Sequence, residues 1–268
     1  MSANPVDYAV TTAHKQTPEM VVRALEIAAV LHCVYVERNE RSLETLLNNR
    51  SLSGLVVVAT DKISYVSDEG EEFFFHPGLS GLRINQLTSG HTDRMIEAMS
   101  LEAGDRVLDC TLGLGTDAVV AGHVAGTAGC VVGLECSPVL AYLVGTGLSA
   151  YTVKDKNLTE AMRRVQVMRV DHLDYLQNLA AGSFDVIYFD PMFRAPRMRS
   201  TAINSLRSLA DPAPVTGRAV DLAVNAAGKR VVMKERRGSP EFARLGFSVI
   251  SGGRYAPVKY GVIDCHGR

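Results

Sequence analysis

The sequence of 268 residues lacks any apolar run approaching the ~18–20 residues that a membrane-spanning helix requires. Its first ten residues, MSANPVDYAV, lack a basic segment followed by an apolar one, so no secretory signal is expected. The five cysteines lack C-x-x-C spacing, and no His/Cys/Asp cluster has the spacing of a metal site. These absences argue against a disulfide framework and a structural zinc site, and they predict a cytoplasmic protein with no metal and no membrane partner.

A strong net charge is also missing, because 28 basic and 29 acidic residues give a formal net charge of -1. The charges are nevertheless unevenly distributed. Residues 194–268 hold 14 Lys and Arg against 5 Asp and Glu, a balance of +9, whereas the other 193 residues have a balance of -10. Such asymmetry can focus an anionic partner onto one end of a molecule, although a solvated basic surface without a partner has the same composition.

Two patterns of organisation divide the chain. Residues 18–31 have helical periodicity behind Thr17 as an N-cap, and residues 55–76 are typical of a meander of short strands, so we predict a small N-terminal α/β domain over residues 1–79. From residue 80 to 268, helices and strands alternate regularly and end in two strands joined by a short loop. This second pattern predicts an α/β domain with an open, mostly parallel seven-stranded sheet and a C-terminal antiparallel hairpin.

Ligands of such sheets bind beyond the carboxyl ends of the strands. The first four predicted strands of the second domain each end in an acid, namely Asp109, Glu135, Asp171 and Asp190. The first of these acids is followed by a turn whose residues let a ligand approach the backbone, namely Thr111, Gly113 and Gly115. One acid at a strand end is often only a helix cap, but four on successive strands indicate a nucleotide site, with Glu135 on a ribose diol and Asp171 on an exocyclic amine.

Two cofactors are compatible with this turn. Gly113-x-Gly115-x-x-Ala118 matches the dinucleotide pattern with Glu135 in range of the expected acid, which allows an NAD-dependent oxidoreductase. Three other features favour an S-adenosylmethionine site of the class I methyltransferase type, with its Rossmann-like fold: Asp109 four residues before Gly113, the terminal hairpin, and an acid-Pro-x-aromatic turn after the fourth strand. The dinucleotide alternative leaves all three unexplained.

The acid-Pro-x-aromatic turn lies in residues 184–199, FDVIYFDPMFRAPRMR. An exocyclic amine is a poor nucleophile, so a carboxylate that accepts its hydrogens and orients its nitrogen at the methyl donor speeds the transfer. Asp190 fits this role with Pro191 in the same turn, and Phe193 would stack on a base drawn out of its helix. The alternative is that Asp190 and Pro191 only form a turn and that Phe193 fills the core.

Basic residues follow this turn and the end of the next strand. We predict that they contact RNA phosphates, and they are Arg194, Arg197, Arg199, Lys234, Arg236 and Arg237. A non-catalytic RNA-binding or ribosome assembly factor that retains the cofactor pocket would have the same features, so this alternative stays open.

Four segments resemble the RsmJ-type ribosomal RNA methyltransferase family: VLDCTLGLGTDAVV, VVGLECSPVLAYLVGTGL, DVIYFDPMF and KRVVMKE. The resemblance covers about residues 80–250. It implies methyl transfer from S-adenosylmethionine to N2 of a guanine in small-subunit rRNA, free or in a ribosomal particle. The cofactor contacts that it implies are Thr116, Asp117, Glu135, Cys136, Asp171, His172 and Asp190. The chain departs from the family pattern at Thr116 and Cys136, where the family has basic residues.

Overall fold

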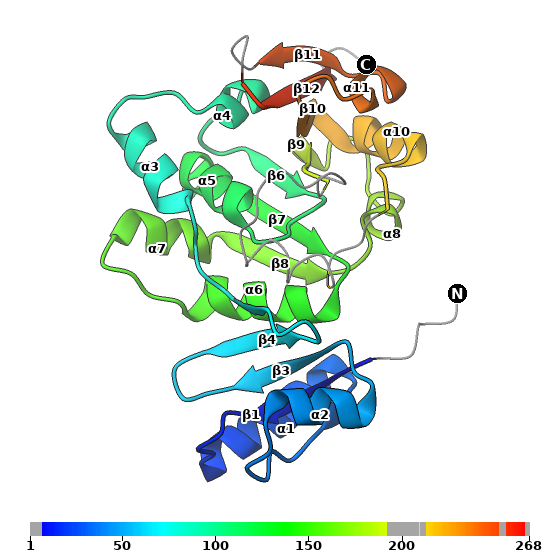
Figure 1. Cartoon of the computed structure of the whole chain (residues 1–268). Coiled ribbons are helices and arrows are strands. Elements are labelled where there is room, and N and C mark those ends of the chain that lie inside the picture. The colour runs from blue at the N-terminus through cyan, green and yellow to red at the C-terminus, as the bar shows by residue number, and fades with distance from the viewer. Residues whose placement is uncertain (1–6, 192–208, 210–212, 252–255, 266–268) are drawn as a thin grey trace. The chain divides into compact units, whose positions relative to one another are not determined.

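The computed structural model describes residues 7–191, 209, 213–251 and 256–265 (Figure 1). The chain separates into two compact units. One contains residues up to Phe75 together with Ser137–Leu143, and the other contains His76–Cys136 and most of the chain beyond Val144. Along the described residues, none of the helices combines the length and the apolar character that crossing a bilayer requires.

The first unit is built on a five-stranded sheet. Its strands are β1 (Tyr8–Thr12), β2 (Val34–Tyr35), β3 (Gly54–Val58), β4 (Ile63–Ser67) and β5 (Glu72–Phe74). They lie in the order β2-β1-β3-β4-β5, with β1 parallel to β2 and β3 and the last two pairs antiparallel. Helices α1 (Pro18–Leu31) and α2 (Leu43–Arg50) begin at capping hydroxyls, because Thr17 and Ser42 each accept a hydrogen bond from a first-turn N–H group.

The second unit is built on a seven-stranded sheet. Its strands are β6 (Arg106–Asp109), β7 (Cys130–Glu135), β8 (Val165–Arg169), β9 (Phe184–Phe189), β10 (Ala227–Arg236), β11 (Ser248–Ser251) and β12 (Val258–Asp264). Their order is β11-β12-β10-β9-β6-β7-β8. The neighbouring strands β8, β7, β6, β9 and β10 are all parallel, and β12 is antiparallel to both of its neighbours. The predicted mostly parallel sheet with a C-terminal antiparallel hairpin is therefore confirmed.

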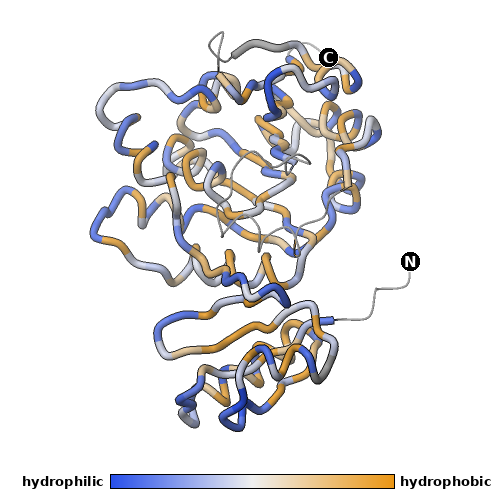
Figure 2. The backbone as a smooth tube through the Cα atoms, in the orientation of Figure 1, coloured by the Kyte–Doolittle hydropathy of each residue, from blue (hydrophilic) through white to orange (hydrophobic). Residues whose placement is uncertain are grey.

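Helices cover both faces of this sheet. They are α3 (Ser80–Thr88), α4 (Arg94–Met99), α5 (Thr116–Ala125), α7 (Lys156–Arg163), α8 (His172–Leu176), α10 (Gly217–Ala226) and α11 (Glu241–Arg244), while α6 (Pro138–Ala150) spans the division between the units. The core on one face joins α8, α10 and α11 to the central strands. On the other face α5 packs on β6 and β7 and is flanked by α3 and α7. Figure 2 shows the apolar stretches along the strands of this unit.

Successive side chains of a strand point to opposite faces of the sheet, and the end of β9 shows this alternation. The phenol of Tyr188 reaches Asp117 on α5. The next residue, Phe189, packs its ring edge to face with His172 of α8, with the ring centroids 6.0 Å apart. The last two residues of β9 therefore connect the end of this strand to both helical layers.

Candidate active site

Four acids lie along one edge of the second sheet. Strands β8, β7, β6 and β9 are neighbours in that order and all run in one direction, so their carboxyl ends meet at the same edge. The acids at these ends are Asp171, Glu135, Asp109 and Asp190. The structure thus brings together the four acids that were predicted at strand ends.

The glycine-rich turn after β6 is held on both sides. The N–H of Cys110 donates to a carbonyl of β9 (2.9 Å), and the N–H of Leu112 donates to a carbonyl of β7 (3.0 Å). Gly113 and Gly115 have φ angles of 51° and 74°, in the left-handed region that favours glycine. Gly115 is also the N-cap of α5, so the turn delivers the chain directly into a helix start with free N–H groups.

Side chains tie this turn to the strand ends. Thr111 donates its N–H to Oδ1 of Asp109 (3.0 Å), and its hydroxyl accepts the N–H of Asp190 (2.6 Å). The N–H of Gly113 donates to Oε2 of Glu135 (3.2 Å). These bonds fix the backbone at Asp190 beside the glycine-rich turn, although the two segments are far apart in the sequence.

Burial changes the protonation of two of the acids. Burial raises the pKa of Asp109 to about 8, against the opposing effect of its hydrogen bond from Thr111 and with support from the nearby Asp117 and Asp190. Burial also raises the pKa of Asp190, and Lys234 limits the rise, so the pKa is about 6. The edge therefore holds one carboxyl that is largely protonated at neutral pH and one that is largely ionised.

A chain of alternating charges begins at Asp190. Nζ of Lys234 lies 2.6 Å from Oδ2 of Asp190 and 3.0 Å from Oδ2 of Asp117. Arg83 of α3 binds the other oxygen of Asp117. The same guanidinium makes two bonds to Asp93, of 2.7 Å and 2.9 Å. The five residues, Asp190, Lys234, Asp117, Arg83 and Asp93, come from the ends of β9 and β10 and from the helical layer of α3, α4 and α5, and they are named the charge chain below.

Two tyrosines border the charge chain, namely Tyr188 and, opposite Lys234 on β12, Tyr260. Tyr188 makes a direct contact. Its hydroxyl donates to Oδ2 of Asp117 (2.8 Å), and burial raises the pKa of the phenol well above its usual value. Burial alone would raise the pKa of Asp117 too, but Lys234 and Arg83 outweigh it and hold that pKa well below its usual range. Asp117 is therefore an anion fixed between two cations.

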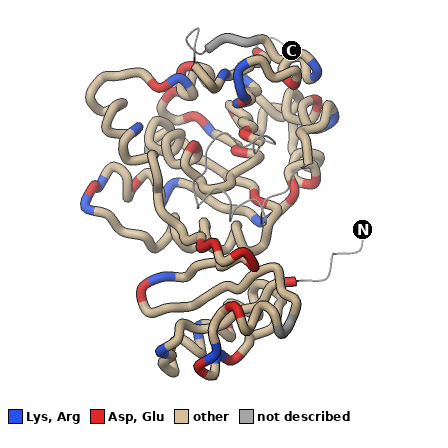
Figure 3. The backbone as a smooth tube through the Cα atoms, in the orientation of Figure 1, with Lys and Arg blue, Asp and Glu red and all other residues tan. Residues whose placement is uncertain are grey.

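Lys234 does not lie where the sequence analysis expected it. It was predicted on a phosphate-binding rim, yet its ammonium is held between two carboxylates and its side chain is only 20% exposed. The reason is strand alternation, which points Lys234 toward α5 on the same face as Tyr188. Arg236 and Arg237, beyond it, are exposed at the end of β10, in a part of the chain where Figure 3 shows basic positions.

Asp171 and His172 lie at the start of α8. Oδ1 of Asp171 caps this helix by accepting the N–H of Leu173 (2.8 Å) and that of Asp174 (3.4 Å). Its side chain remains 37% exposed, and Nδ1 of His172 lies 4.0 Å from its second oxygen. Asp171 therefore caps α8. The predicted contact with the cofactor can use only the acceptor positions of this carboxylate that the helix cap leaves unoccupied.

The other predicted positions lie around the same edge. The carbonyl of Thr116, in the first turn of α5, accepts a hydrogen bond from Ser80 (3.2 Å). Cys136 is exposed next to Glu135, and Pro191 is half-buried directly after Asp190. Phe193 and three arginines of the predicted RNA surface lie outside the described residues; the arginines are Arg194, Arg197 and Arg199.

Three residues of the charge chain and its surroundings were not predicted, namely Arg83, Asp93 and Tyr188. Asp93 had a local signal, because an Asp before a helix is a typical N-cap, and it accepts from the N–H groups of Met95 and Ile96. Tyr188 could have been found from strand alternation, which places it on the face of β9 opposite Phe189. Arg83 had no local signal, since its partners are distant in the sequence.

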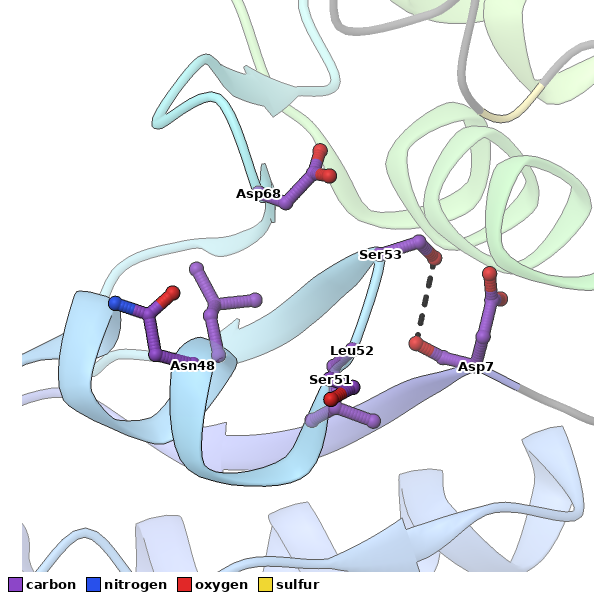
Figure 4. A pocket seen from close by; sticks show the side chains of 7 residues that line it. Asp7, Asn48, Ser51, Leu52, Ser53 and Asp68 are labelled. Atoms are coloured by element: carbon purple, nitrogen blue, oxygen red, sulfur yellow. Dashed lines mark hydrogen bonds between the residues drawn. The ribbon is translucent and has the colours of Figure 1, made fainter.

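A separate hollow lies in the first unit (Figure 4). It is lined by Asp7, Leu47, Asn48, Ser51, Leu52, Ser53 and Asp68. The hydroxyl of Ser53 donates to the carbonyl of Asp7 (3.3 Å). The lining has two carboxylates and no cationic side chain among these described residues, so it does not share the chemistry of the edge described above.

Comparisons with known proteins agree with this geometry. The uncharacterized protein YpiP of Bacillus subtilis is 36% identical over 95% of this chain and 98% of its own length. A protein named ribosomal RNA small subunit methyltransferase J from Desulfotalea psychrophila is 27% identical over 84% of this chain and 85% of its own length. One of the same name from Laribacter hongkongensis is 36% identical, over 52% of this chain and 50% of its own length.

The fold also has a counterpart among solved structures. The crystal structure of a SAM-dependent methyltransferase from Neisseria gonorrhoeae superimposes with a TM-score of 0.63 over 97% of both chains, at 18% identity, which shows a shared fold. Residues 75–249 match the family model described as "Putative SAM-dependent methyltransferase". That match covers more than half of the chain and shows the family. The chain belongs to the SAM-dependent methyltransferases, and it is similar to the relatives named ribosomal RNA small subunit methyltransferase J.

Proposed function

We propose that this enzyme transfers a methyl group from its cofactor, S-adenosylmethionine, to an exocyclic amine of a nucleobase, and that the target is N2 of a guanine in small-subunit rRNA. The observation that carries the proposal is the position of Asp190, whose backbone is bonded to Thr111 of the glycine-rich turn at 2.6 Å. A carboxylate is thereby fixed next to the turn at which this fold binds its ligand. The names of the relatives from Desulfotalea and Laribacter support rRNA as the substrate.

The residues at the edge fit S-adenosylmethionine. The left-handed glycines let the backbone come close to a ligand, and the N–H groups of Thr116 and Asp117 in the first turn of α5 suit its carboxylate. Glu135 is 8% exposed and bonded to Gly113, so it can accept from ribose hydroxyls, and Asp171 can accept from the adenine amine. The side chain of Asp117 is bound by the other members of the charge chain, so only its main chain is left to bind the cofactor.

The protein has to orient the amine and accept its proton. When bound, S-adenosylmethionine supplies a methyl group that is already activated on a sulfonium sulfur. Asp190 accepts a hydrogen bond from the amine and orients its nitrogen for in-line attack. As the nitrogen–carbon bond forms and the carbon–sulfur bond breaks, one amine proton must leave, and Asp190 is its first acceptor. A carboxylate with a pKa of about 6 can then release that proton to water at neutral pH.

RNA binding is assigned to the basic C-terminal part. Arg236 and Arg237 are exposed at the end of β10, directly beyond the strand position of Lys234, whose ammonium contacts Asp190. A base bound for reaction at Asp190 would thus have phosphates within reach of these guanidinium groups. Arg194, Arg197 and Arg199 follow the D-P-M-F turn in the sequence and belong to the same proposal.

The test is transfer of labelled methyl groups to small-subunit rRNA, offered free and as particles, followed by digestion to nucleosides. Asp190→Asn is compared with Asp185→Asn, a matched control on the same strand, where Asp185 binds the backbone N–H of Arg106 at 2.8 Å. We expect label in N2-methylguanosine, a loss of at least ~100-fold in Asp190→Asn from the lost orientation and proton acceptance, and near wild-type transfer in Asp185→Asn.

Other outcomes would change the proposal. Label in a different nucleoside would refute guanine N2 and keep the reaction class. Cofactor binding without label in any nucleoside would refute small-subunit rRNA as the substrate and favour the non-catalytic RNA-binding or assembly role. Full activity of Asp190→Asn would remove Asp190 from the mechanism.

A further inference from the structure

We infer that Lys234 is a positioning residue, which holds Asp190 as an oriented anion and is itself fixed by the rest of the charge chain. This inference rests on the proposed function, because it assigns the group that prepares Asp190 for its part in methyl transfer. Lys234 enters neither the cofactor contacts nor the RNA contacts.

The first step is the contact itself. Nζ of Lys234 lies 2.6 Å from Oδ2 of Asp190, so this oxygen is tied to a cation. The proposal assigns the other oxygen, Oδ1, to accept from the amine. A carboxylate held at one oxygen cannot rotate freely, so the acceptor direction of Oδ1 is set before the substrate arrives.

The second step is that Lys234 is itself held. Lysine is a flexible side chain, and an ion pair with one exposed partner would contribute little. Here the ammonium is bound a second time, at 3.0 Å, to Asp117. Asp117 is in turn bound by the Tyr188 hydroxyl at 2.8 Å and by Arg83, and Arg83 makes two bonds to Asp93. The position of Nζ therefore depends on α3, α4 and α5 rather than on lysine alone.

The third step is the charge that faces Asp190. The titratable groups around it are Lys234 from β10, Asp117 from α5, Asp109 from β6 and Tyr188 from its own strand. Lys234 is the cation among them, while the other three are acids. Without it, Asp190 would face the anion of Asp117 inside a half-buried site, where a like charge and burial both favour the neutral acid. A neutral Asp190 cannot take the amine proton.

The experiment compares three variants in the full-length protein. Lys234→Met removes the charge at similar length, and Lys234→Arg keeps the charge. Lys229→Met is the matched control, because Lys229 lies on the same strand and binds Asp105 at 2.7 Å far from Asp190 in the register of β10. The readout that does not depend on activity is a carbon NMR titration of ¹³C-labelled aspartate carboxyls, in which Asp190→Asn identifies the Asp190 signal.

We expect the Asp190 titration midpoint near pH 6 in the wild type and in Lys229→Met. In Lys234→Met it should rise by ~1–3 pH units, the effect of losing a nearby opposite charge. In Lys234→Arg it should stay close to the wild-type value. The acid limb of the kcat profile for methyl transfer should move by the same amount, so that kcat of Lys234→Met at pH 7 falls by about twofold for a rise of one pH unit and by roughly tenfold to a hundredfold for a rise of two to three. Binding of S-adenosylmethionine should change little.

An unchanged Asp190 midpoint in a folded Lys234→Met variant would overturn the inference. So would a loss of kcat in Lys234→Met without any movement of the acid limb, because that pattern marks a merely structural residue. The proposed function fails differently: Asp190→Asn would then transfer methyl groups normally, whatever the titration shows. Far-ultraviolet circular dichroism of each variant establishes that it is folded.

Discussion

Replacing Asp109 by Asn should stabilise the protein relative to the wild type, and increasingly so as the pH rises. Asp109 is 2% exposed, and burial raises its pKa to about 8, above the value near 4 that an unfolded chain gives it. The folded state therefore keeps a proton that the unfolded state releases. An acid whose pKa is raised by folding makes its full contribution to the free energy of unfolding at pH values below its unfolded pKa. This contribution is lost as the pH rises toward the folded pKa.

The magnitude follows from the width of that window. Between the two pKa values the free energy of unfolding falls by ~1.4 kcal/mol per pH unit, so from pH 5 to pH 7.5 the loss is about 3 kcal/mol. An asparagine has no proton to lose and can still accept the N–H of Thr111 with its own Oδ1. The difference in unfolding free energy between Asp109→Asn and the wild type should therefore grow by about 3 kcal/mol over the same range.

Urea unfolding followed by far-ultraviolet circular dichroism at pH 5, 6, 7 and 7.5 measures this difference without cofactor. Asp185→Asn is the control: burial raises the pKa of Asp185, but the N–H and guanidinium of Arg106 outweigh it and hold the pKa below its usual value. Asp185 thus stays ionised throughout the range, and the difference for its variant should be flat. A flat difference for Asp109→Asn as well would refute the reasoning, because Asp109 would then be ionised in the folded protein.

Three further predictions concern the same edge and the basic surface. The kcat/KM for methyl transfer should fall about tenfold per pH unit below about pH 6, since Asp190 must be ionised to accept the amine proton; a profile that is flat down to pH 5 would contradict this. Gly115→Ala should lower the free energy of unfolding by ~1–2 kcal/mol, because its φ of 74° strains any other residue, and unchanged urea unfolding would exclude that strain. RNA affinity should fall steeply with salt, and the double variant Arg236→Ala with Arg237→Ala should reduce the slope of log K against log salt by ~0.7–0.9 for each phosphate that the variant no longer neutralises; an unchanged slope would remove these arginines from the RNA surface.

Local signals in the sequence were enough to find most of the fold. Helix α1 was predicted with the bounds that the structure has, because a capping Thr17 and Pro18 mark its start. The ends of β6, β7, β8 and β9 were predicted to within two residues, because an acid follows or ends each of these apolar runs. Helix α7 was missed although its start also has a cap, Asp155, which accepts from the N–H groups of Asn157 and Leu158. Its short run of mostly polar residues hid the periodicity of its buried positions, which are Leu158, Ala161 and Met162.

Only the part of the candidate site that lies at the ends of individual strands could be predicted from the sequence. The acids and glycines lie at strand ends, so the parallel order of the sheet gathers them without further information. The charge chain could not be found in this way, since it needs the packing of α3, α4 and α5 against β10. Arg83 lies in a segment without a recognisable motif, and Lys234 was predicted on the surface because it is a charged residue, although the strand pattern places it on the α5 face of the sheet. The domain boundary after residue 79 and the roles of the site residues stay predictions.

The two-sided attachment of the glycine-rich turn has a consequence for its dynamics. Glycine-rich segments usually belong to the least protected parts of a protein, whose amide hydrogens exchange rapidly with water. Here the amides of Cys110 and Leu112 extend the hydrogen bonding of the central sheet past the end of β6. Their deuterium uptake should be as slow as that of the central strands, even without cofactor. A turn that is ordered in advance loses little conformational entropy on binding, so more of the contact energy appears as cofactor affinity.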